Sequence, residues 1–165
     1  MADHVDLVLE QWSERRPDLD ASPMAVLGRL KRLAQVVDGE LRRNFAAHDL
    51  DSASFDVLAT LRRSNPEHSL TPAGLMRSSM VTSGAITQRL DRLEARGLVS
   101  RRPSETDGRG VLVTLTPTGL ELIDAVLPTH LATENRLLEA LSGAEREALA
   151  DTLRTLLESL GDKTD

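Results

Sequence analysis

Apolar residues recur at helical spacing along most of this chain. One long predicted helix runs from residue 22 to about residue 45, and its buried stripe consists of residues three or four apart: Val26, Leu30, Leu33, Val37 and Leu41. Similar patterns predict helices over residues 3–15, 54–63, 71–78, 83–96, 116–141 and from 142 onward. Three of these helices open on a hydroxyl residue followed by proline, a pairing typical of helix N-termini: Ser22, Thr71 and Thr116. Ser142 and Glu145 form a capping box for the last helix.

The pattern changes between residues 98 and 116. Val111 to Leu115 is rich in β-branched and apolar residues, whereas the stretch PSETDGRG before it is polar and contains turn residues. This combination predicts a β-hairpin with a long tip. Two short helices joined by about three residues, at 71–78 and 83–96, come directly before it. The order predicts a mainly α fold with a small β-hairpin wing, the winged helix-turn-helix.

Charge is distributed unevenly along the chain. The net charge is −6, but residues 77–109 contain seven arginines and four acids, so that this segment is +3 and the rest −9. A basic segment in an acidic protein is typical of a local phosphate contact, although a solvated surface gives the same pattern. A platform for stacking single-stranded bases is not expected with one Trp, two Phe and no Tyr.

Other features of the composition exclude whole classes of protein. The absence of cysteine excludes disulfides, thiolate zinc sites and cysteine nucleophiles, and fits a reducing compartment. No apolar run approaches the roughly 20 residues that span a bilayer, and the first residues do not resemble a secretory signal. We therefore expect a cytoplasmic protein without a membrane partner.

The predicted helix over residues 83–96 has two different faces. At 100° per residue, Ile86, Leu90 and Leu93 share one face, which we expect to point into the core. The opposite face and the N-terminal end carry small, hydroxyl, amide and basic residues, and the candidate DNA-binding residues here are Thr82, Ser83, Gly84, Thr87, Gln88 and Arg92. Gln and Arg can pair with base edges, and a helix N-terminus offers N–H groups to phosphate. An ordinary amphipathic surface helix would show the same two faces.

The predicted hairpin tip adds Asp107 and Arg109. An arginine on a loop tip suits insertion into the minor groove, where the potential is most negative. Asp107 is a candidate to pair with a nearby arginine and fix the tip. A solvated turn is the alternative for an isolated D-x-R.

The segment TSGAITQRLDRLEARGLVSRR (82–102), followed by DGRGVLVTLTPTG (107–119), closely resembles the signature of the MarR family of bacterial transcriptional regulators. The resemblance covers nearly the whole chain. It implies a homodimer with interlocking N- and C-terminal helices, and it makes Arg109 of the D-x-R motif the minor-groove contact. The family often has a second arginine within this motif, where Gly108 stands here.

The residues themselves favour a dimer as well. The first and last helices carry long Leu and Val stripes that few other elements could cover, and exposed patches of that size are unusual on monomers. We expect an N-terminal extension helix (1–20), a dimerisation helix (21–50), a winged helix-turn-helix (51–115) and C-terminal dimerisation helices (116–165). A two-fold dimer predicts a roughly palindromic operator in double-stranded DNA.

Two further segments, EQWSERRPDLD (10–20) and LPTHLATENRLL (127–138), resemble the urate-responsive (HucR/PecS-like) branch of that family. This resemblance implies a ligand site at Trp12, Asp56 and Arg89 for urate or another small anion. On a helical wheel Arg89 points inward beside Leu93, while Asp56 lies opposite Leu58 and Leu61 and faces either a pocket or water. Arg101 or Arg102 is a candidate partner that Asp56 would release. The alternative is structural: Trp12 packs, Arg89 binds an internal carboxylate and Asp56 is solvated.

No catalytic motif is present. The chain has no nucleophile elbow, no phosphate-binding glycine loop and no metalloprotease motif, and its four histidines lack ligand spacing. We expect no enzyme activity, no cofactor and no metal site. Two alternatives remain beside a ligand-responsive regulator: a helical scaffold whose helix-turn-helix binds protein, and a small-molecule enzyme on the same core.

Overall fold

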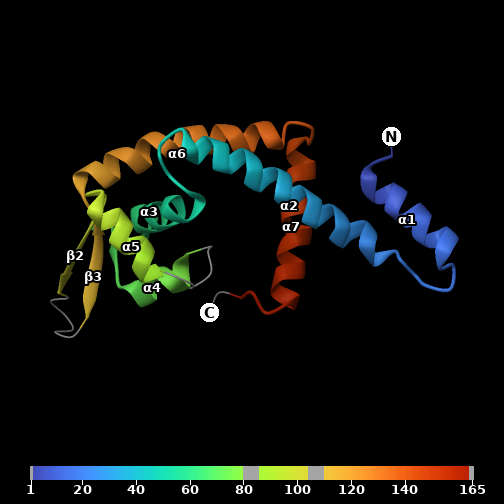
Figure 1. The fold of residues 1–165 in the computed structure, drawn as a ribbon, viewed down its shortest axis with the longest axis horizontal. Coiled ribbons are helices and arrows are strands. Elements are labelled where there is room, and N and C mark those ends of the chain that lie inside the picture. The colour runs from blue at the N-terminus through green and yellow to red at the C-terminus, as the bar shows by residue number, and fades with distance from the viewer. Residues whose placement is uncertain (1, 80–85, 104–109, 164–165) are drawn as a thin grey trace. The chain divides into compact units, whose positions relative to one another are not determined.

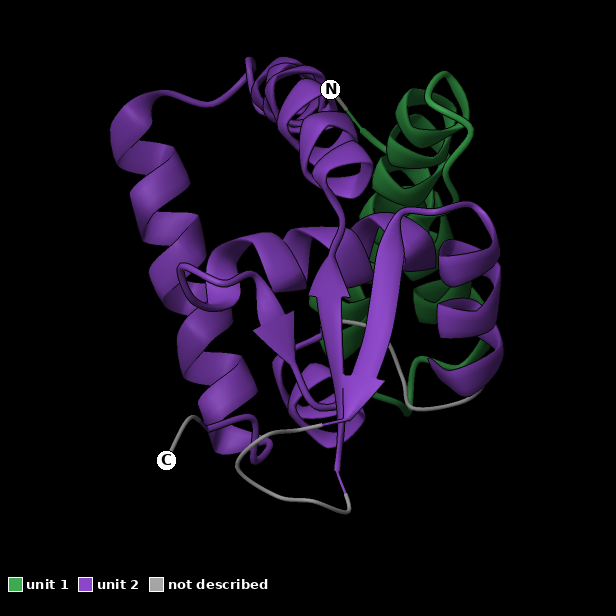
Figure 2. Cartoon of the chain, turned by 90° about the vertical axis from the view of Figure 1, so that its left-hand side faces the viewer, with its two compact units in different colours: residues 1–52 green, residues 53–165 purple. Residues whose placement is uncertain are grey.

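The computed structural model describes residues 2–79, 86–103 and 110–163. Helices account for most of these residues (Figure 1). Three short strands form one sheet. The chain divides into two compact units, residues 1–52 and residues 53–165 (Figure 2). This architecture confirms the mainly α fold with a small wing that the hydrophobic pattern predicts.

The first unit consists of two helices, α1 (His4–Arg15) and α2 (Pro23–Ala46). A capping box begins α1, in which Asp3 accepts hydrogen bonds from the N–H groups of Val5 and Asp6 while Asp6 accepts from the N–H of Asp3. Arg29 of α2 then reaches both carboxylates, with its Nε 2.8 Å from Asp3 Oδ2 and its Nη2 2.6 Å from Asp6 Oδ1. The start of α1 is thus tied to α2.

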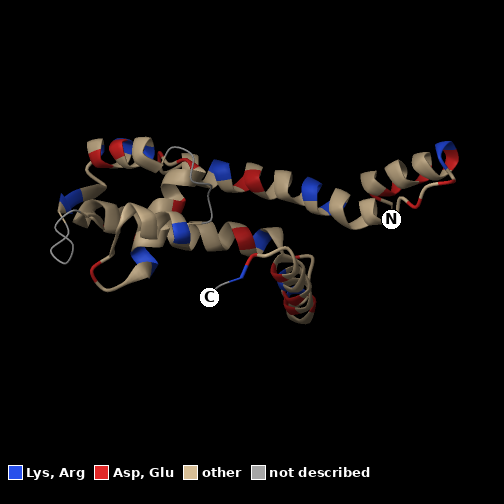
Figure 3. Ribbon diagram, turned by 90° about the horizontal axis from the view of Figure 1, so that it is seen from below, with Lys and Arg blue, Asp and Glu red and all other residues tan. Residues whose placement is uncertain are grey.

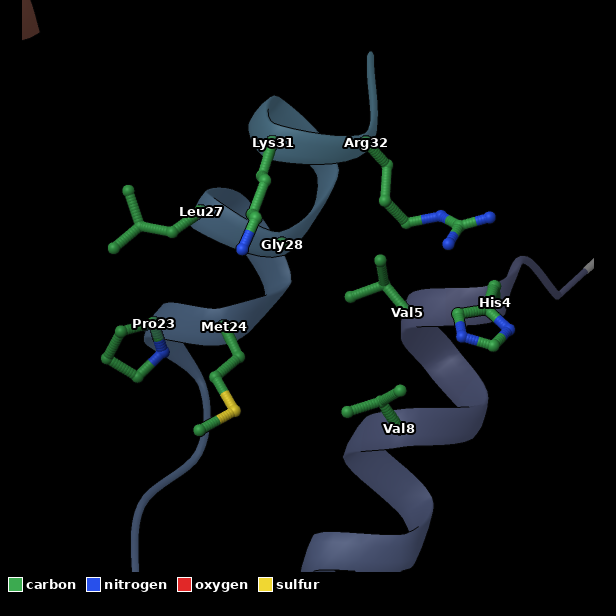
Figure 4. Close-up of a pocket in the computed structure, with 9 residues that line it drawn as sticks. All are labelled: His4, Val5, Val8, Pro23, Met24, Leu27, Gly28, Lys31 and Arg32. Atoms are coloured by element: carbon green, nitrogen blue, oxygen red, sulfur yellow. The ribbon is translucent and has the colours of Figure 1, made fainter. Parts of the chain in front are cut away.

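An apolar groove of about 630 Å³ lies between these two helices (Figure 4). Val5 and Val8 point from α1 toward α2, and Val5 lies within 3.5 Å of the position a Cβ would take at Gly28. The groove is lined by His4, Val5, Val8, Pro23, Met24, Leu27, Gly28, Lys31 and Arg32. Much of its apolar surface remains exposed, since Met24 and Leu27 are both solvent-accessible.

The predicted cap of α2 is wrong. Ser22 has the helical φ and ψ values −53° and −34°, and its side chain makes no capping hydrogen bond. A capping side chain needs an extended backbone at its own residue, which Ser22 lacks. Its N–H is held instead by Asp20 Oδ1 at 2.9 Å.

The second unit contains the remaining elements. Its helices are α3 (Ser52–Ser64), α4 (Pro72–Ser78), α5 (Ile86–Ala95), α6 (Pro117–Leu137) and α7 (Gly143–Ser159). The caps predicted at Thr71, Thr116 and Ser142 are confirmed, because each side chain accepts the N–H three residues later. None of the helices in the described part of the chain has the length and apolar character needed to cross a membrane.

The sheet is antiparallel in the order β1-β3-β2. The predicted hairpin is present as β2 (Val99–Pro103) and β3 (Val111–Leu115), paired from Val99 with Leu115 to Pro103 with Val111. The two strands lie side by side in Figure 2. Strand β1 (Ser69–Leu70) was not predicted. It pairs with the edge of β3 that does not face β2. Two residues are too short to show an alternating pattern.

Apolar side chains from α3, α4, α5, α6 and the β2–β3 hairpin form the core of the second unit. The largest fully buried apolar side chains are Leu58, Leu61, Leu75, Leu90, Leu93, Ile123, Val57, Val99, Val113 and Val126. Helix α3 is buried all round, from Ser54 to Leu61. Asp56 on this helix is therefore buried as well, with 8% of its surface exposed, which excludes the solvated position that the sequence left open.

Candidate nucleic-acid interface

The two short helices of the predicted helix-turn-helix are α4 and α5. Thr71 caps α4, and Leu75 fixes its inner face with no exposed surface. Arg63 of α3 donates from Nη2 to the carbonyl oxygen of Ser78 at 2.7 Å, which satisfies a carbonyl in the last turn of α4. Helix α4 is therefore held at its start, its middle and its end.

Helix α5 has the two faces predicted from its sequence. Leu90 and Leu93 are buried with 2% and 1% of their surface exposed, and Ile86 is half-buried. On the other side Thr87, Gln88 and Arg92 are exposed. The described helix begins at Ile86, so three candidate DNA-binding residues lie outside the described residues: Thr82, Ser83 and Gly84.

The C-terminal end of α5 is joined closely to the start of α6. Gly97 has φ +69°, the left-handed conformation that glycine commonly adopts just after a helix ends. Thr116 Oγ1 donates to the carbonyl oxygen of Gly97 at 2.6 Å, and the N–H of Thr116 donates to that of Leu98 at 3.1 Å. A Cβ at Gly119 would lie 2.0 Å from the Leu98 carbonyl oxygen, so this approach requires glycine. The end of α5 is thereby fixed against the base of the wing.

A cluster of charged side chains connects α5 with β2. Arg101 Nη2 lies 2.6 Å from Asp91 Oδ1 and 2.6 Å from Glu94 Oε2, and Arg101 Nε lies 2.9 Å from Glu94 Oε2. The main-chain N–H of Arg101 also donates to Glu94 Oε1 at 3.0 Å. The hydrogen bonds from the Arg101 side chain hold the pKa of Glu94 below its usual range, and those with Glu94 and Asp91 raise the pKa of Arg101.

Sequence reasoning missed this cluster. The sequence pattern gave Asp91 and Glu94 no partner, and it made Arg101 or Arg102 a candidate partner of Asp56. The structure instead engages Arg101 with Asp91 and Glu94. The spacing of Asp91 and Glu94, three residues apart on one helix, was the available signal.

The tip of the wing carries the other predicted DNA contacts. Asp107 and Arg109 both lie outside the described residues. The described part of the basic segment carries exposed arginines on α4, at the end of α5 and on β2: Arg77, Arg92, Arg96 and Arg102. Figure 3 shows all described Lys and Arg residues of the chain in blue. Positive side chains are thus exposed on α4, α5 and β2, which follow one another along the chain.

The three predicted ligand residues are divided between the units. Trp12 lies on α1 in the first unit and is 41% exposed, while Asp56 and Arg89 belong to the second unit. Arg89 is half-buried, as its helical-wheel position predicts, and its Nη1 atom is buried without a hydrogen-bond partner in the described structure. A buried guanidinium N–H that lacks an acceptor costs free energy, so an acceptor bound at this atom would be stabilising.

Two contacts of His130 in the second unit were not anticipated. The rings of Phe55 and His130 lie with their centroids 4.5 Å apart, and His130 Nε2 is 3.2 Å from Glu134 Oε1. The four-residue spacing of His130 and Glu134 on α6 was the only sequence signal. Within the described ranges, no group of three or more His, Asp or Glu side chains is arranged to hold a metal ion.

Comparison with known proteins assigns the chain to a family. The family model described as the MarR family matches residues 48–110. The HTH-type transcriptional regulator PecS of Dickeya dadantii is 37% identical over 142 residues, which are 86% of this chain and 86% of PecS.

Solved structures give the same result. MarR from Escherichia coli, as a mutant complexed with operator DNA, matches with a TM-score of 0.73 and 31% identity over 84% of this chain and 99% of that one. Bordetella bronchiseptica BpsR, whose DNA binding is regulated by 6-hydroxynicotinic acid, matches with a TM-score of 0.72 and 27% identity over 79% and 91%. The chain thus belongs to the MarR family of DNA-binding transcriptional regulators.

Proposed function

We propose that this chain is a homodimeric repressor that binds a palindromic operator through α5 and the wing, and that a small anionic aromatic ligand such as urate releases it. The division of α5 into two faces carries this proposal. Leu90 and Leu93 are committed to the core, which leaves Thr87, Gln88 and Arg92 free for a duplex. A helix that enters the major groove needs this division.

Each candidate DNA contact has a distinct role. Gln88 and Arg92 read base edges, because an amide or a guanidinium can form paired hydrogen bonds there. Thr87, with Thr82, Ser83 and Gly84, approaches the phosphates at the start of the helix. Arg109 enters the minor groove, and Asp107 fixes the wing tip that presents it. Arg77 and Arg102, both exposed, add phosphate contacts.

Exposed apolar side chains support the homodimer. Helix α2 exposes Val26, Leu27, Leu33 and Val36, and α7 with its C-cap exposes Leu149, Leu156, Leu157 and Leu160. Side chains of this kind on two helices exceed what a soluble monomer usually exposes. We assign both helices to the dimer interface, as the segments 21–50 and 116–165. Because the dimer is two-fold, its operator consists of two related half-sites.

The unpaired Nη1 of Arg89 supports the ligand role. An anionic ligand would supply the acceptor that this buried atom lacks in the described structure. The relative BpsR responds to 6-hydroxynicotinic acid, a flat aromatic acid, which is the chemical class that we propose here. Trp12 would stack on such a ring, and the buried carboxylate of Asp56 would be repelled by the anion.

Ligand and DNA are then coupled through one equilibrium. The ligand favours a spacing of the two recognition helices that does not match the operator, and DNA favours the other spacing. By linkage, operator DNA weakens ligand binding by the same factor by which the ligand weakens operator binding.

An electrophoretic mobility shift assay tests the proposal. The probe is a duplex selected by the protein from random sequences, titrated with urate, 6-hydroxynicotinate and salicylate. Arg89→Met and Trp12→Ala should bind this duplex normally but resist release, whereas Arg92→Met, the matched control on α5, should bind it poorly and respond to ligand. Release of the Arg89 variant at the wild-type ligand concentration would exclude the assigned pocket.

Salt dependence separates this proposal from a protein-binding scaffold. A regulator that makes about 6–10 phosphate contacts loses roughly three to five decades of affinity between 50 and 200 mM salt. A scaffold would show weak duplex binding with a flat salt dependence. An enzyme on the same core would convert the bound aromatic acid, and chromatography of the ligand after incubation checks for this.

A further inference from the structure

The ion cluster between α5 and β2 brings together two parts of the chain that must act on DNA as one unit. Asp91 and Glu94 project from the recognition helix, and Arg101 projects from the first strand of the wing. Four hydrogen bonds between 2.6 and 3.0 Å join them, of which three use the guanidinium and one uses the main chain. The contact therefore fixes both the side chain and the strand backbone.

Electrostatics alone does not explain these acids. A carboxylate on an exposed helix face repels phosphate, and Asp91 has 55% of its side chain exposed. One arginine neutralises only one of the two carboxylates, so that the cluster keeps a net charge of −1 beside a surface expected to meet DNA. Attraction to the duplex therefore does not explain why these two carboxylates lie here, and another role has to be found for them.

The geometry of the cluster indicates that its role is to orient the wing. The guanidinium is a planar fork that holds its partners in a defined direction, and the Arg101 side chain is only 28% exposed. Arg101 is paired with Val113 in the β2–β3 ladder, so a tie at this residue holds both strands of the hairpin. The opposite end of α5 has no comparable tie to β2 among the described residues.

We propose that Arg101 is a positioning residue that locks the wing to the recognition helix through Asp91 and Glu94, so that minor-groove and major-groove contacts engage the operator in one fixed register. The inference rests on the proposed DNA-binding function. Arg101 contacts no phosphate in this account, and its charge is already used within the protein.

Removing the whole cluster tests the proposal. The variant Asp91→Asn, Glu94→Gln, Arg101→Met is neutral where the wild type is −1, so simple charge attraction predicts tighter binding to every duplex. Positioning predicts a loss of about tenfold in the ratio of affinities for the selected operator duplex and a shuffled duplex, comparable to the loss of one base contact. The slope of log affinity against log salt should not change.

Arg102→Met is the matched control, because it removes an exposed arginine from the neighbouring position of the same strand. It should reduce the salt slope by about one and leave the affinity ratio unchanged. The single change Asp91→Asn, which keeps the pairing of Glu94 with Arg101, should reduce the ratio by less than the triple variant does. Thermal unfolding of each variant checks that it is folded.

A measurement without DNA tests the tie between α5 and the wing separately from the proposed function. Amide hydrogen exchange over residues 99–103 and 111–115 should accelerate in the triple variant and not in Arg102→Met. Failure of the wild type to prefer any duplex would overturn the proposed function and, with it, the role in DNA recognition. Wild-type preference in the triple variant, or unchanged exchange, would overturn the positioning role alone.

Discussion

Helices α5 and α7 have similar sequence patterns and opposite environments. Each carries leucines at helical spacing with charged residues between them. In α5 these leucines are buried, with Leu90 and Leu93 at 2% and 1% exposure. In α7 no residue is buried, and Leu156 and Leu157 are 36% and 50% exposed. The spacing of the leucines predicts an apolar face on both helices, but it does not show whether the same chain or another chain covers that face.

This difference in burial indicates that the leucines of α5 serve folding, whereas we propose that those of α7 serve assembly. The apolar face of α5 is satisfied within its own chain, so its polar face is free to meet DNA. We propose that a second chain covers the apolar face of α7, because leucine exposed on this scale is costly in water. Substitutions of leucine in α5 should therefore lower the stability of the fold, whereas those in α7 should weaken the dimer.

The largest effect is expected from Leu93→Ala in α5. Truncating a fully buried leucine leaves a cavity, and we expect a loss of about 2–5 kcal/mol in the free energy of unfolding. Urea denaturation followed by far-UV circular dichroism measures it. The control Thr155→Ala, at an exposed polar position of α7, should change the free energy by less than about 0.5 kcal/mol. Equal losses in the two helices would contradict the comparison.

The next effect concerns assembly and comes from Leu157→Glu in α7. Burying one leucine contributes about 1.5–3 kcal/mol, so its loss should raise the dimer dissociation constant by one to two decades while helicity is retained. Sedimentation velocity over a concentration series measures this constant. Thr155→Glu adds the same charge at an exposed polar position and should leave the dimer intact. A Leu157→Glu protein that dimerises like the wild type would remove α7 from the interface.

A smaller and more selective effect is expected from Gln88→Ala on the outer face of α5. Loss of a base contact should cost about 1–3 kcal/mol of discrimination at one position in each half-site. Binding to duplexes that differ by single base pairs measures this preference, and urea denaturation should show wild-type stability. A uniform loss over all sequences would make Gln88 a phosphate contact.

The smallest effect is a pH dependence at α1. A hydrogen bond from the Asp6 N–H, together with Arg29, lowers the pKa of Asp3, and a hydrogen bond from the Asp3 N–H, together with Arg29, lowers the pKa of Asp6. Depressed values mean that the tie to α2 is complete above the ordinary aspartate pKa of about 3.9 and is lost as the pH falls through the lower folded values. These groups are exposed, so the contribution is small.

Trp12 reports on this transition, because it is the single tryptophan and lies on α1. Its fluorescence should change below about pH 4 in the wild type. Arg29→Met should shift the change toward higher pH, whereas Arg32→Met, an exposed cation on the same helix, should not. Identical titrations of the two variants would show that Arg29 does not hold α1.

Local rules predicted most of the elements of this fold. Thr71, Thr116 and Ser142 were identified as caps because a hydroxyl residue before a helical pattern has few other roles, and each makes the expected hydrogen bond. Ser22 has the same local signature and fails, because its backbone is helical. The helical wheel also placed Leu90, Leu93 and Arg89 correctly on α5, since α5 has one buried side.

Features that depend on contacts distant in the sequence were not predictable. A wheel places Asp56 opposite Leu58 and Leu61, but α3 is enclosed on all sides, so its polar face is buried too. The bond of Arg101 to Asp91 and Glu94 depends on how a strand crosses a helix, which no periodicity encodes. The roles of Thr82, Ser83, Gly84, Asp107 and Arg109 stay predictions, because these residues lie outside the described ranges.

The central claim is that the outer face of α5 lies against DNA while its inner face holds the fold. A photoreactive benzoyl-phenylalanine at position 88 tests this directly, with the same group at position 155 on α7 as control. After irradiation with the selected operator duplex, the label at position 88 should crosslink to DNA and the label at position 155 should not. A crosslink from position 88 to a second protein chain, with none to DNA, would contradict the account.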